Sequence, residues 1–177
     1  AESTTYVFNN RGQVTQSLDP RGVAVTNSYD DAGRLYRILS SGEPPGVRHV
    51  DATYNFYTSA SSTQLGWVAS QISDGITQSF TYTAEGSIAT HATSFGAHAG
   101  TVSLTYDTGA RLSGVTYPDA YHVDYSYNLD DSISQLTDGP LTVLGTYLYD
   151  DDGQVSVLTN QFGLDESHTY DARGRRV

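Results

Sequence analysis

Alternating apolar and polar residues recur along the whole chain in short runs, and each run ends on an aromatic side chain. The closing aromatic residues lie 21 to 27 residues apart and are Phe8, Tyr29, Phe56, Tyr82, Tyr106, Tyr127, Tyr149 and Tyr170. Alternation with a period of two is typical of β-strands, because successive side chains of a strand point to opposite faces. No window has helical periodicity. The pattern predicts eight copies of one short β-repeat.

A turn signature follows the closing aromatic residues. Asp or Asn comes next in most copies, a glycine stands four residues after the aromatic residue, and an aliphatic residue stands six after it. Asp and Asn cap nearby backbone N–H groups, and glycine adopts the positive φ that reverses the chain. The predicted turn residues are Asp30, Asp107, Asp150 and Asp171, with Gly12, Gly33, Gly86, Gly153 and Gly174. Three copies depart from the pattern, with Ala60, Ala110 and Asp131 at the glycine position and Gly109 one residue early.

A second turn divides each repeat. Residues 19–22, 73–75, 117–120, 138–140 and 161–163 are rich in Pro, Asp and Gly between strand-like runs. Each repeat is therefore strand, turn, strand, turn, which is the content of a β-hairpin array. We expect an all-β fold and one array spanning residues 1–177, with loop insertions near residues 40–48 and 91–100. A Ser-rich patch at residues 59–64 marks a third copy that has lost its glycine.

Composition agrees with thin β-structure. Hydrophobic residues make up only 37% of the chain, and 14 tyrosines outnumber 5 phenylalanines. A formal net charge of −11 disfavours nucleic-acid partners and anionic membrane surfaces. The chain has no cysteine for disulfides or thiolate metal sites, and it contains no apolar run long enough to span a bilayer. This acidic, Tyr-rich composition predicts an extracellular or cell-surface bacterial protein.

Three segments carry a family resemblance. Residues 29–35 (YDDAGRL), 149–155 (YDDDGQV) and 170–175 (YDARGR) resemble the signature of the YD (Rhs) repeat family, and residues 117–127 resemble its second-turn segment. The resemblance covers essentially the whole chain. It implies a curved or spiralling ribbon of antiparallel β-hairpins, like those that form shells in Rhs proteins, insecticidal toxin-complex subunits and teneurins. Such shells encase toxin domains or serve cell-surface contact, and the family is also linked to carbohydrate binding. Eight repeats suffice for an arc of such a ribbon.

The acidic turns are the one candidate for a metal site. Asp30-Asp31, Asp130-Asp131 and residues 150–153 (DDDG) offer carboxylates to Ca²⁺. Each run nevertheless falls on a predicted turn, where Asp is expected for structural reasons, and the distal glutamate of a calcium-binding loop is missing. We therefore expect structural turns and no metal or other cofactor.

Catalytic chemistry finds no support in the sequence. The five histidines lie in no catalytic motif, and no Gly-x-Ser-x-Gly nucleophile elbow occurs. Asp19-Pro20 resembles the autoproteolytic motif of Rhs proteins but fits an ordinary second turn equally well. We predict that the chain is not an enzyme.

Some aromatic residues lie outside the periodic positions and are candidates for carbohydrate contact. They are Trp67, Tyr57, Tyr117 and Tyr121, with Asp119 as a hydrogen-bonding neighbour. Exposed flat rings can stack on the apolar face of a sugar. The alternative is that these rings pack against neighbouring strands and stabilise the sheet.

Two functional hypotheses remain open at this point. The first is a non-catalytic extracellular structural or interaction module, whose partners are neighbouring repeats of a larger protein or a second copy joined head to tail as a fibre. The second is a carbohydrate-binding module that recognises cell-surface glycans through exposed aromatic residues.

Overall fold

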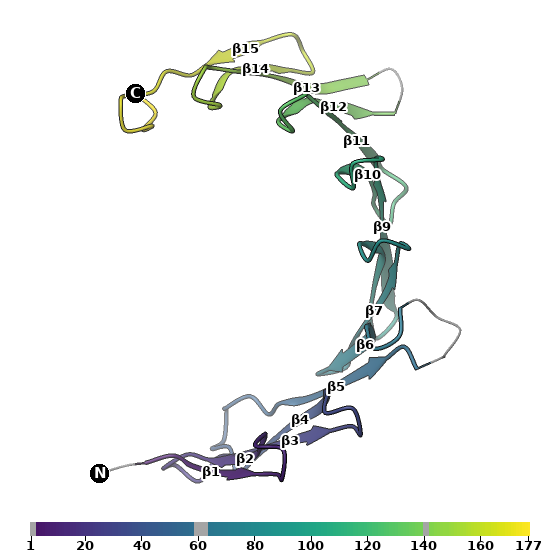
Figure 1. The fold of residues 1–177 in the computed structure, drawn as a ribbon, viewed down its shortest axis with the longest axis vertical. Coiled ribbons are helices and arrows are strands. Elements are labelled where there is room, and N and C mark those ends of the chain that lie inside the picture. Colours follow the sequence, from purple (N-terminus) through teal and green to yellow (C-terminus); the bar gives the residue numbers. More distant parts are fainter. Residues whose placement is uncertain (1–2, 59–63, 140–141) are drawn as a thin grey trace. The chain divides into compact units, whose positions relative to one another are not determined.

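The computed structural model describes residues 3–58, 64–139 and 142–177, and these residues form strands joined by turns (Figure 1). The fifteen strands are β1 (Thr5–Phe8), β2 (Val14–Leu18), β3 (Ala24–Tyr29), β4 (Leu35–Ser41), β5 (Asp51–Phe56), β6 (Val68–Ser73), β7 (Ile76–Tyr82), β8 (Ile88–Phe95), β9 (His98–Tyr106), β10 (Leu112–Thr116), β11 (His122–Tyr127), β12 (Ile133–Asp138), β13 (Thr142–Tyr149), β14 (Val155–Asn160) and β15 (Asp165–Ser167). The all-β prediction is confirmed. None of the described residues forms a helix that could cross a membrane.

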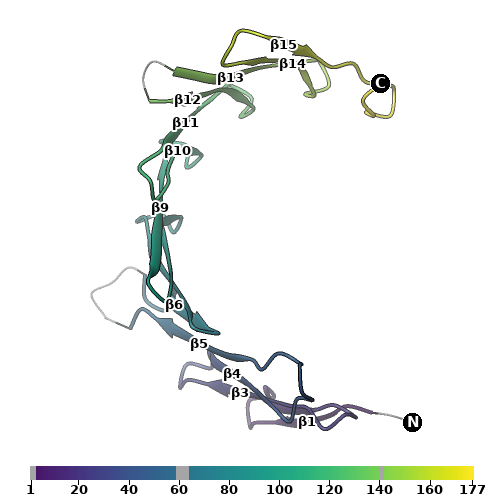
Figure 2. The ribbon, with the colours of Figure 1, turned by 180° about the vertical axis from the view of Figure 1, so that it is seen from behind.

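Strands that follow one another in the chain are hydrogen-bonded neighbours in the sheet. The chain divides into two compact units, Ala1–Thr101 and Val102–Val177, with the boundary inside β9. The first unit contains β1 to β8 and the second contains β10 to β15, and each is a single layer of antiparallel strands (Figures 1 and 2).

A register shift marks the end of the strand that carries a closing aromatic residue. The shift lies between Ser28 and Tyr29 in β3, between Thr81 and Tyr82 in β7, and between Ser126 and Tyr127 in β11. Such bulges bend a strand and re-aim its side chains. Here the bulge turns the aromatic residue toward the preceding hairpin.

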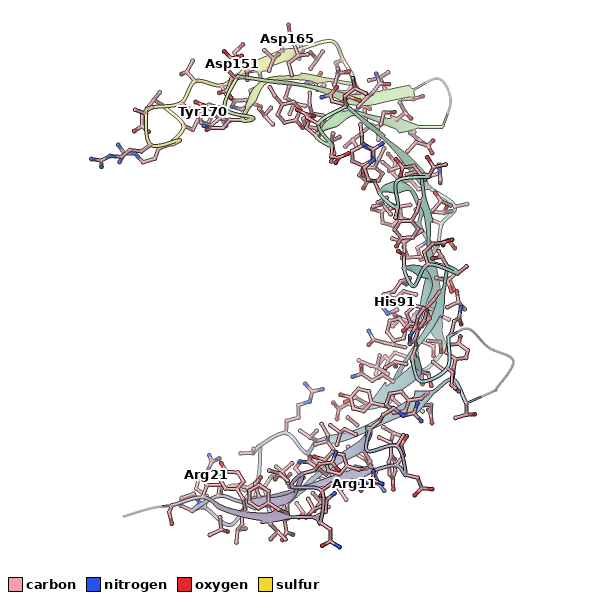
Figure 3. All side chains as sticks on the ribbon, viewed as in Figure 1. Arg11, Arg21, His91, Asp151, Asp165 and Tyr170 are labelled. Atoms are coloured by element: carbon pink, nitrogen blue, oxygen red, sulfur yellow. The ribbon has the colours of Figure 1, made fainter. Side chains whose placement is uncertain are left out.

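The core is thin because each unit has only one layer. Among the described residues, the buried hydrophobic side chains are Ala52, Val115 and Val123, and Ser40 is a buried polar residue. Side chains project from the ribbon along its length (Figure 3). Cross-strand pairs and turn contacts must therefore supply much of the stability that a thick core supplies elsewhere.

Of the two loops expected from the sequence, the one near residues 91–100 is largely strand, and the one near residues 40–48 falls mostly between two strands. Residues 91–100 were predicted to form a loop, but they lie in the long hairpin of β8 and β9, whose turn is at Gly96. Small residues such as Ala and Thr fit a strand as easily as a loop, so composition misled this prediction. Residues 42–50 do lie between strands β4 and β5.

Candidate functional site

In most repeats the first turn is built around one acidic or amide side chain. In the turn after β3, the Asp30 N–H donates to the Arg34 carbonyl (2.9 Å) and the Gly33 N–H donates to the Asp30 carbonyl (2.9 Å). The Asp30 carboxylate accepts from the Arg34 backbone N–H (2.8 Å) and from the Arg34 Nε–H (2.7 Å). These two contacts, the backbone one first, lower the pKa of Asp30. The carboxylate is thereby committed to the turn.

The same arrangement recurs in other copies. The Asp107 carboxylate accepts from the backbone and the guanidinium of Arg111, and the Asp171 carboxylate accepts from Arg175 in the same way. The Arg side chains lower the pKa of both carboxyl groups. Asp150 accepts from the Gln154 backbone N–H at 2.8 Å. All four predicted turn aspartates therefore bind their own backbone.

The predicted glycines lie where the chain has positive φ. The φ values are +76° at Gly12, +82° at Gly33, +101° at Gly86, +76° at Gly153 and +73° at Gly174. In the Tyr106 copy the positive φ falls on Ala110 (+62°), not on the early Gly109, and in the next copy it falls on Asp131 (+68°). A left-handed backbone costs a residue other than glycine on the order of 1 kcal/mol. The turn hydrogen bonds hold these two residues there despite that cost.

The third copy has a turn glycine after all, displaced by an insertion. The Tyr57 N–H donates to the Trp67 carbonyl (2.9 Å), the Gly66 N–H donates to the Tyr57 carbonyl (2.9 Å), and Gly66 has a φ of +88°. Tyr57, Gly66 and Trp67 thus replace Asp30, Gly33 and Arg34 of the second copy. The expectation that this copy had lost its glycine is wrong, because the insertion moved the glycine out of the regular spacing. Ala60, the expected substitute, lies outside the described residues.

Closing tyrosines tie five of the repeats to the repeat before them. In these copies the hydroxyl donates to a backbone carbonyl that follows the preceding first turn: Tyr29 to Val14 (3.0 Å), Tyr82 to Val68 (2.8 Å), Tyr127 to Leu112 (2.7 Å), Tyr149 to Ile133 (2.8 Å) and Tyr170 to Val155 (2.9 Å). Burial raises the pKa of the hydroxyls of Tyr82 and Tyr149. The hydroxyl explains the preference for Tyr over Phe at these positions.

In several repeats the residue after the first-turn glycine position reaches forward to the next repeat, and we call this position the rung. The Gln13 side-chain amide donates to the Gly33 carbonyl at 2.8 Å. The Arg34 guanidinium lies 4.5 Å above the Phe56 ring, and the Arg111 guanidinium lies 4.6 Å above the Tyr127 ring. Cation–π contacts of this kind are favourable.

Trp67 is the rung of the third copy. Its ring meets that of Tyr82 edge to face, with 5.0 Å between centroids, and a Cβ on Gly86 would lie 3.1 Å from the ring. The Tyr57 hydroxyl donates to the Phe80 carbonyl at 2.8 Å. Both aromatic residues are therefore half-buried parts of the contact between repeats. The sequence placed them outside the repeat only because the insertion hid their register.

Tyr117, Asp119 and Tyr121 come together at the second turn between β10 and β11. The two rings are 41–42% exposed, their centroids are 6.1 Å apart, and Asp119 accepts the Tyr121 backbone N–H at 3.1 Å. With Pro118 these residues line an open cavity of about 420 Å³. This cavity belongs to the second unit, whereas Trp67 and Tyr57 belong to the first. The five predicted carbohydrate residues thus form two separate groups.

One polar network was not predicted. His122 lies between Thr116 and Asp124, with its Nδ1 2.8 Å from the Thr116 hydroxyl and its Nε2 2.9 Å from the Asp124 carboxylate. Its ring passes over Gly114, where a Cβ would lie 3.1 Å from His122 Cε1. His122 and Asp124 share one face of β11, and Thr116 joins them through the register of β10 and β11, which the sequence does not specify. No group of three or more His, Asp or Glu side chains suited to a metal ion occurs among the described residues.

Comparison with known proteins gives a fold. No family model matches the chain, and no curated protein matches it. This chain is similar to the crystal structures of TcdB2-TccC3-Cdc42 and of TcdB2-TccC3, each with a TM-score of 0.82 and 13% sequence identity. Each match covers 98% of this chain and 10% of the solved chain. The fold is Rhs-like. The Photorhabdus luminescens Tc holotoxin pore gives a TM-score of 0.81 at the same identity and coverage.

The similarity to these toxin complexes covers only a small part of the solved chains. This chain spans about a tenth of the length of the solved chains that it matches. At 13% identity the likeness establishes the fold alone. The resemblance of the YD signatures and the observed Rhs-like fold agree on hairpin repeats as the building unit.

Proposed function

We propose that this chain is a non-catalytic structural module of an extracellular bacterial protein, in which YD-type repeats bind neighbouring repeats. The observation that carries the proposal is the repeated tie between successive hairpins, made by a tyrosine hydroxyl and a rung side chain. Five tyrosines make the same hydrogen bond to the preceding repeat. The Rhs-like fold shared with multi-protein toxin complexes supports the same role.

The hydrogen bonds of the turn carboxylates favour a non-catalytic role. A general acid or base needs a titratable group that is free to exchange protons with a substrate. Asp30, Asp107 and Asp171 have lowered pKa values because each carboxylate accepts hydrogen bonds within its own turn. These carboxylates serve the backbone, which favours a structural role for the most acidic part of the repeat.

The exposed rung residue Arg175 suggests which partner this module binds. The Arg175 side chain is 70% exposed, compared with 31% for Arg34 and 35% for Arg111, which stack on the next aromatic ring. Phe8 is also largely exposed, and Phe56 shows how Arg covers such a ring. A further repeat therefore fits Arg175, from the same larger protein or from a second copy joined head to tail. In sedimentation velocity, head-to-tail association would appear as a concentration-dependent rise that Arg175→Glu abolishes. A monomer at high micromolar concentration would leave only repeats of a larger protein as partners.

Removing the tyrosine hydroxyl tests the structural role. Tyr127→Phe deletes the 2.7 Å bond to Leu112 and keeps the ring under Arg111. We expect a loss of about 1 kcal/mol of unfolding free energy, the usual net value of one hydrogen bond. Tyr36→Phe, on the exposed side of β4, is the matched control. Equal urea midpoints for both variants and the wild type would contradict the role of the closing hydroxyl.

Carbohydrate binding is a second candidate, favoured by the exposed pair of rings at Tyr117 and Tyr121. The apolar cavity between them and the Asp119 carboxylate offer a stacking surface with a hydrogen-bond acceptor. Glycan-array binding should be lost in the double variant Tyr117→Ala/Tyr121→Ala and retained in Trp67→Phe, which keeps a ring in the rung. Binding that survives the double variant would overturn this candidate.

A further inference from the structure

Tyrosine is the main oxidisable side chain of this protein. The sequence contains 14 tyrosines and one tryptophan, and it contains no cysteine, methionine or lysine. Cysteine and methionine take up oxidants through their sulfur atoms, so a chain without them leaves its tyrosines as the principal targets. A disulfide needs two cysteines, and an amide cross-link between side chains needs a lysine. A covalent cross-link between side chains of this chain therefore requires other chemistry, and two phenol rings can supply it.

The turn between β10 and β11 brings two tyrosine rings together. The Tyr117 N–H donates to the Tyr121 carbonyl (2.8 Å), and the Ala120 N–H donates to the Tyr117 carbonyl (2.9 Å). These two bonds place Tyr117 and Tyr121 opposite each other across the turn. Their ring centroids are 6.1 Å apart, and the ring planes make an angle of 33°. A small movement of the two side chains is enough to bring ring carbons beside the hydroxyl groups into contact.

Both rings are open to solvent. They are 41–42% exposed, and with Pro118 and Asp119 they line the cavity of about 420 Å³. Among the described residues, neither hydroxyl donates a hydrogen bond to a protein atom. A phenol that loses an electron must also release its proton. Water in the open cavity is available to accept that proton.

A second pair of tyrosines lies at a similar distance in a different setting. The rings of Tyr57 and Tyr82 have centroids 6.4 Å apart but meet edge to face, at an angle of 75°. Their hydroxyls donate to the carbonyls of Phe80 and Val68, each at 2.8 Å. Burial raises the pKa of Tyr82, because it disfavours the charged phenolate. This half-buried pair is poorly placed to lose protons or to turn its rings toward each other.

From this contrast we propose that Tyr117 and Tyr121 form a dityrosine cross-link when a haem peroxidase and hydrogen peroxide act on the chain. Each tyrosine loses one electron to the oxidant and its phenolic proton to water, and the two radicals join through ring carbons adjacent to their hydroxyls. Each of these carbons then loses its hydrogen as the phenol is restored. One C–C bond forms and two C–H bonds break, while one hydrogen peroxide is reduced to two waters.

Such a link closes the turn covalently, where Ala120 has a positive φ of +67°. It depends neither on the contacts between repeats proposed above nor on carbohydrate binding by the same rings. In the cross-linked chain, amide exchange of Ala120 should slow by about tenfold, because the link closes a short loop.

The test oxidises the dilute full chain with hydrogen peroxide and a haem peroxidase, and then unfolds and digests it with a protease that cleaves before aspartate. Cleavage before Asp107, Asp119 and Asp124 leaves Tyr117 as the one tyrosine of peptide 107–118 and Tyr121 as the one tyrosine of peptide 119–123. We expect the two peptides to be recovered as one species that lacks two hydrogen atoms, together with dityrosine fluorescence. Tyr117→Phe and Tyr121→Phe should each lower the yield of the internal link by about tenfold, since each removes one of two adjacent phenols.

Two control variants and an unfolded sample distinguish a link made by this turn from oxidation elsewhere. Tyr57→Phe, in the half-buried pair, and Tyr36→Phe, at an exposed tyrosine of β4, should leave the yield of the internal link unchanged. In urea the Tyr117–Tyr121 link should form a smaller share of all dityrosine, because the fold no longer positions the rings. The proposal is overturned if the two peptides are recovered separately or joined only in covalent dimers. It is equally overturned if Tyr57 and Tyr82 are linked to the same extent, or if urea leaves the share of the Tyr117–Tyr121 link unchanged.

Discussion

First and second turns of the repeat share one backbone design but use their side chains differently. In the first turn Asp107 donates its N–H to Arg111, and in the second turn Tyr117 donates its N–H to Tyr121, at 2.9 and 2.8 Å. Arg111 also pairs with Asp131 of the following turn at 2.6 Å. Arg21, in a second turn, pairs with Asp19 of its own turn and is 71% exposed.

The comparison teaches where the repeat is constrained and where it is free to vary. First turns contact the next hairpin through their rungs, so their residues are fixed by two repeats at once. Second turns carry exposed rings, such as Tyr117, Tyr121 and Phe162. Exposed apolar groups that gather at one place often mark interaction sites. The first turns therefore supply the contacts that stabilise neighbouring repeats. The exposed side chains of the second turns remain available to bind other molecules.

The largest expected difference between the two kinds of turn concerns glycine. Gly86→Ala places a Cβ at a φ of +101° and 3.1 Å from Trp67, so we expect a loss of about 2–3 kcal/mol. Gly22→Ala, in a second turn with φ +88° and no atom within 4 Å of the added Cβ, should lose about 1 kcal/mol. Urea denaturation measures both. Equal losses would show that contacts between repeats add nothing to backbone strain.

A smaller effect is expected from deleting rings. Trp67→Ala removes a half-buried ring from Tyr82 and Gly86 and should cost about 2 kcal/mol, less than the 3–5 kcal/mol of a fully buried ring. Tyr121→Ala removes an exposed ring and should change stability by less than about 0.5 kcal/mol. Thermal and urea melts decide. A larger loss of stability for Tyr121→Ala than for Trp67→Ala would contradict the conclusion that first-turn contacts stabilise the fold more than second-turn contacts do.

Acid should affect both kinds of turn. The pKa of Asp107 is lowered chiefly by the Arg111 side chain, and that of Asp19 chiefly by the Arg21 side chain. A lowered carboxyl pKa stabilises the fold above the unfolded value of about 3.9, and that contribution is lost as the pH falls through the folded value. Stability should therefore decrease below about pH 4. Arg111→Ala should move the Asp107 titration, followed by NMR, to higher pH, and an unchanged titration would contradict the pairing.

The smallest expected effect is that of calcium. If the acidic runs serve as turns, EDTA should leave Tm unchanged within about 1 °C, because only a bound ligand raises stability by mass action. Asp150 already accepts the backbone N–H groups of Asp152 and Gln154. A marked decrease in Tm with EDTA that Ca²⁺ reverses would show that these turns hold a metal.

The turn residues could be predicted from the sequence, because the same residue types recur at the same spacing. Contacts that depend on the register between strands could not be predicted. Gly33 and Asp30 were predictable because a tight turn needs those residue types at that spacing. Gly66 and Trp67 were missed because an insertion displaced them from the period. The tyrosine ties were missed because a hydroxyl and a carbonyl about 15 residues apart meet only through the bulges of the sheet. The position of Gln71 opposite Gln78 on β6 and β7 likewise depends on cross-strand pairing, which the residues alone do not specify.

Hydrogen exchange of the variant Arg111→Ala tests the central claim, that first-turn rungs couple successive repeats. Arg111 holds its own turn through Asp107 and contacts Tyr127 and Asp131 of the next one. We predict faster amide exchange both at residues 107–111 and at residues 128–132, whereas Arg21→Ala should accelerate exchange only at residues 19–23. Exchange that rises only within the mutated turn in both variants would contradict the coupling.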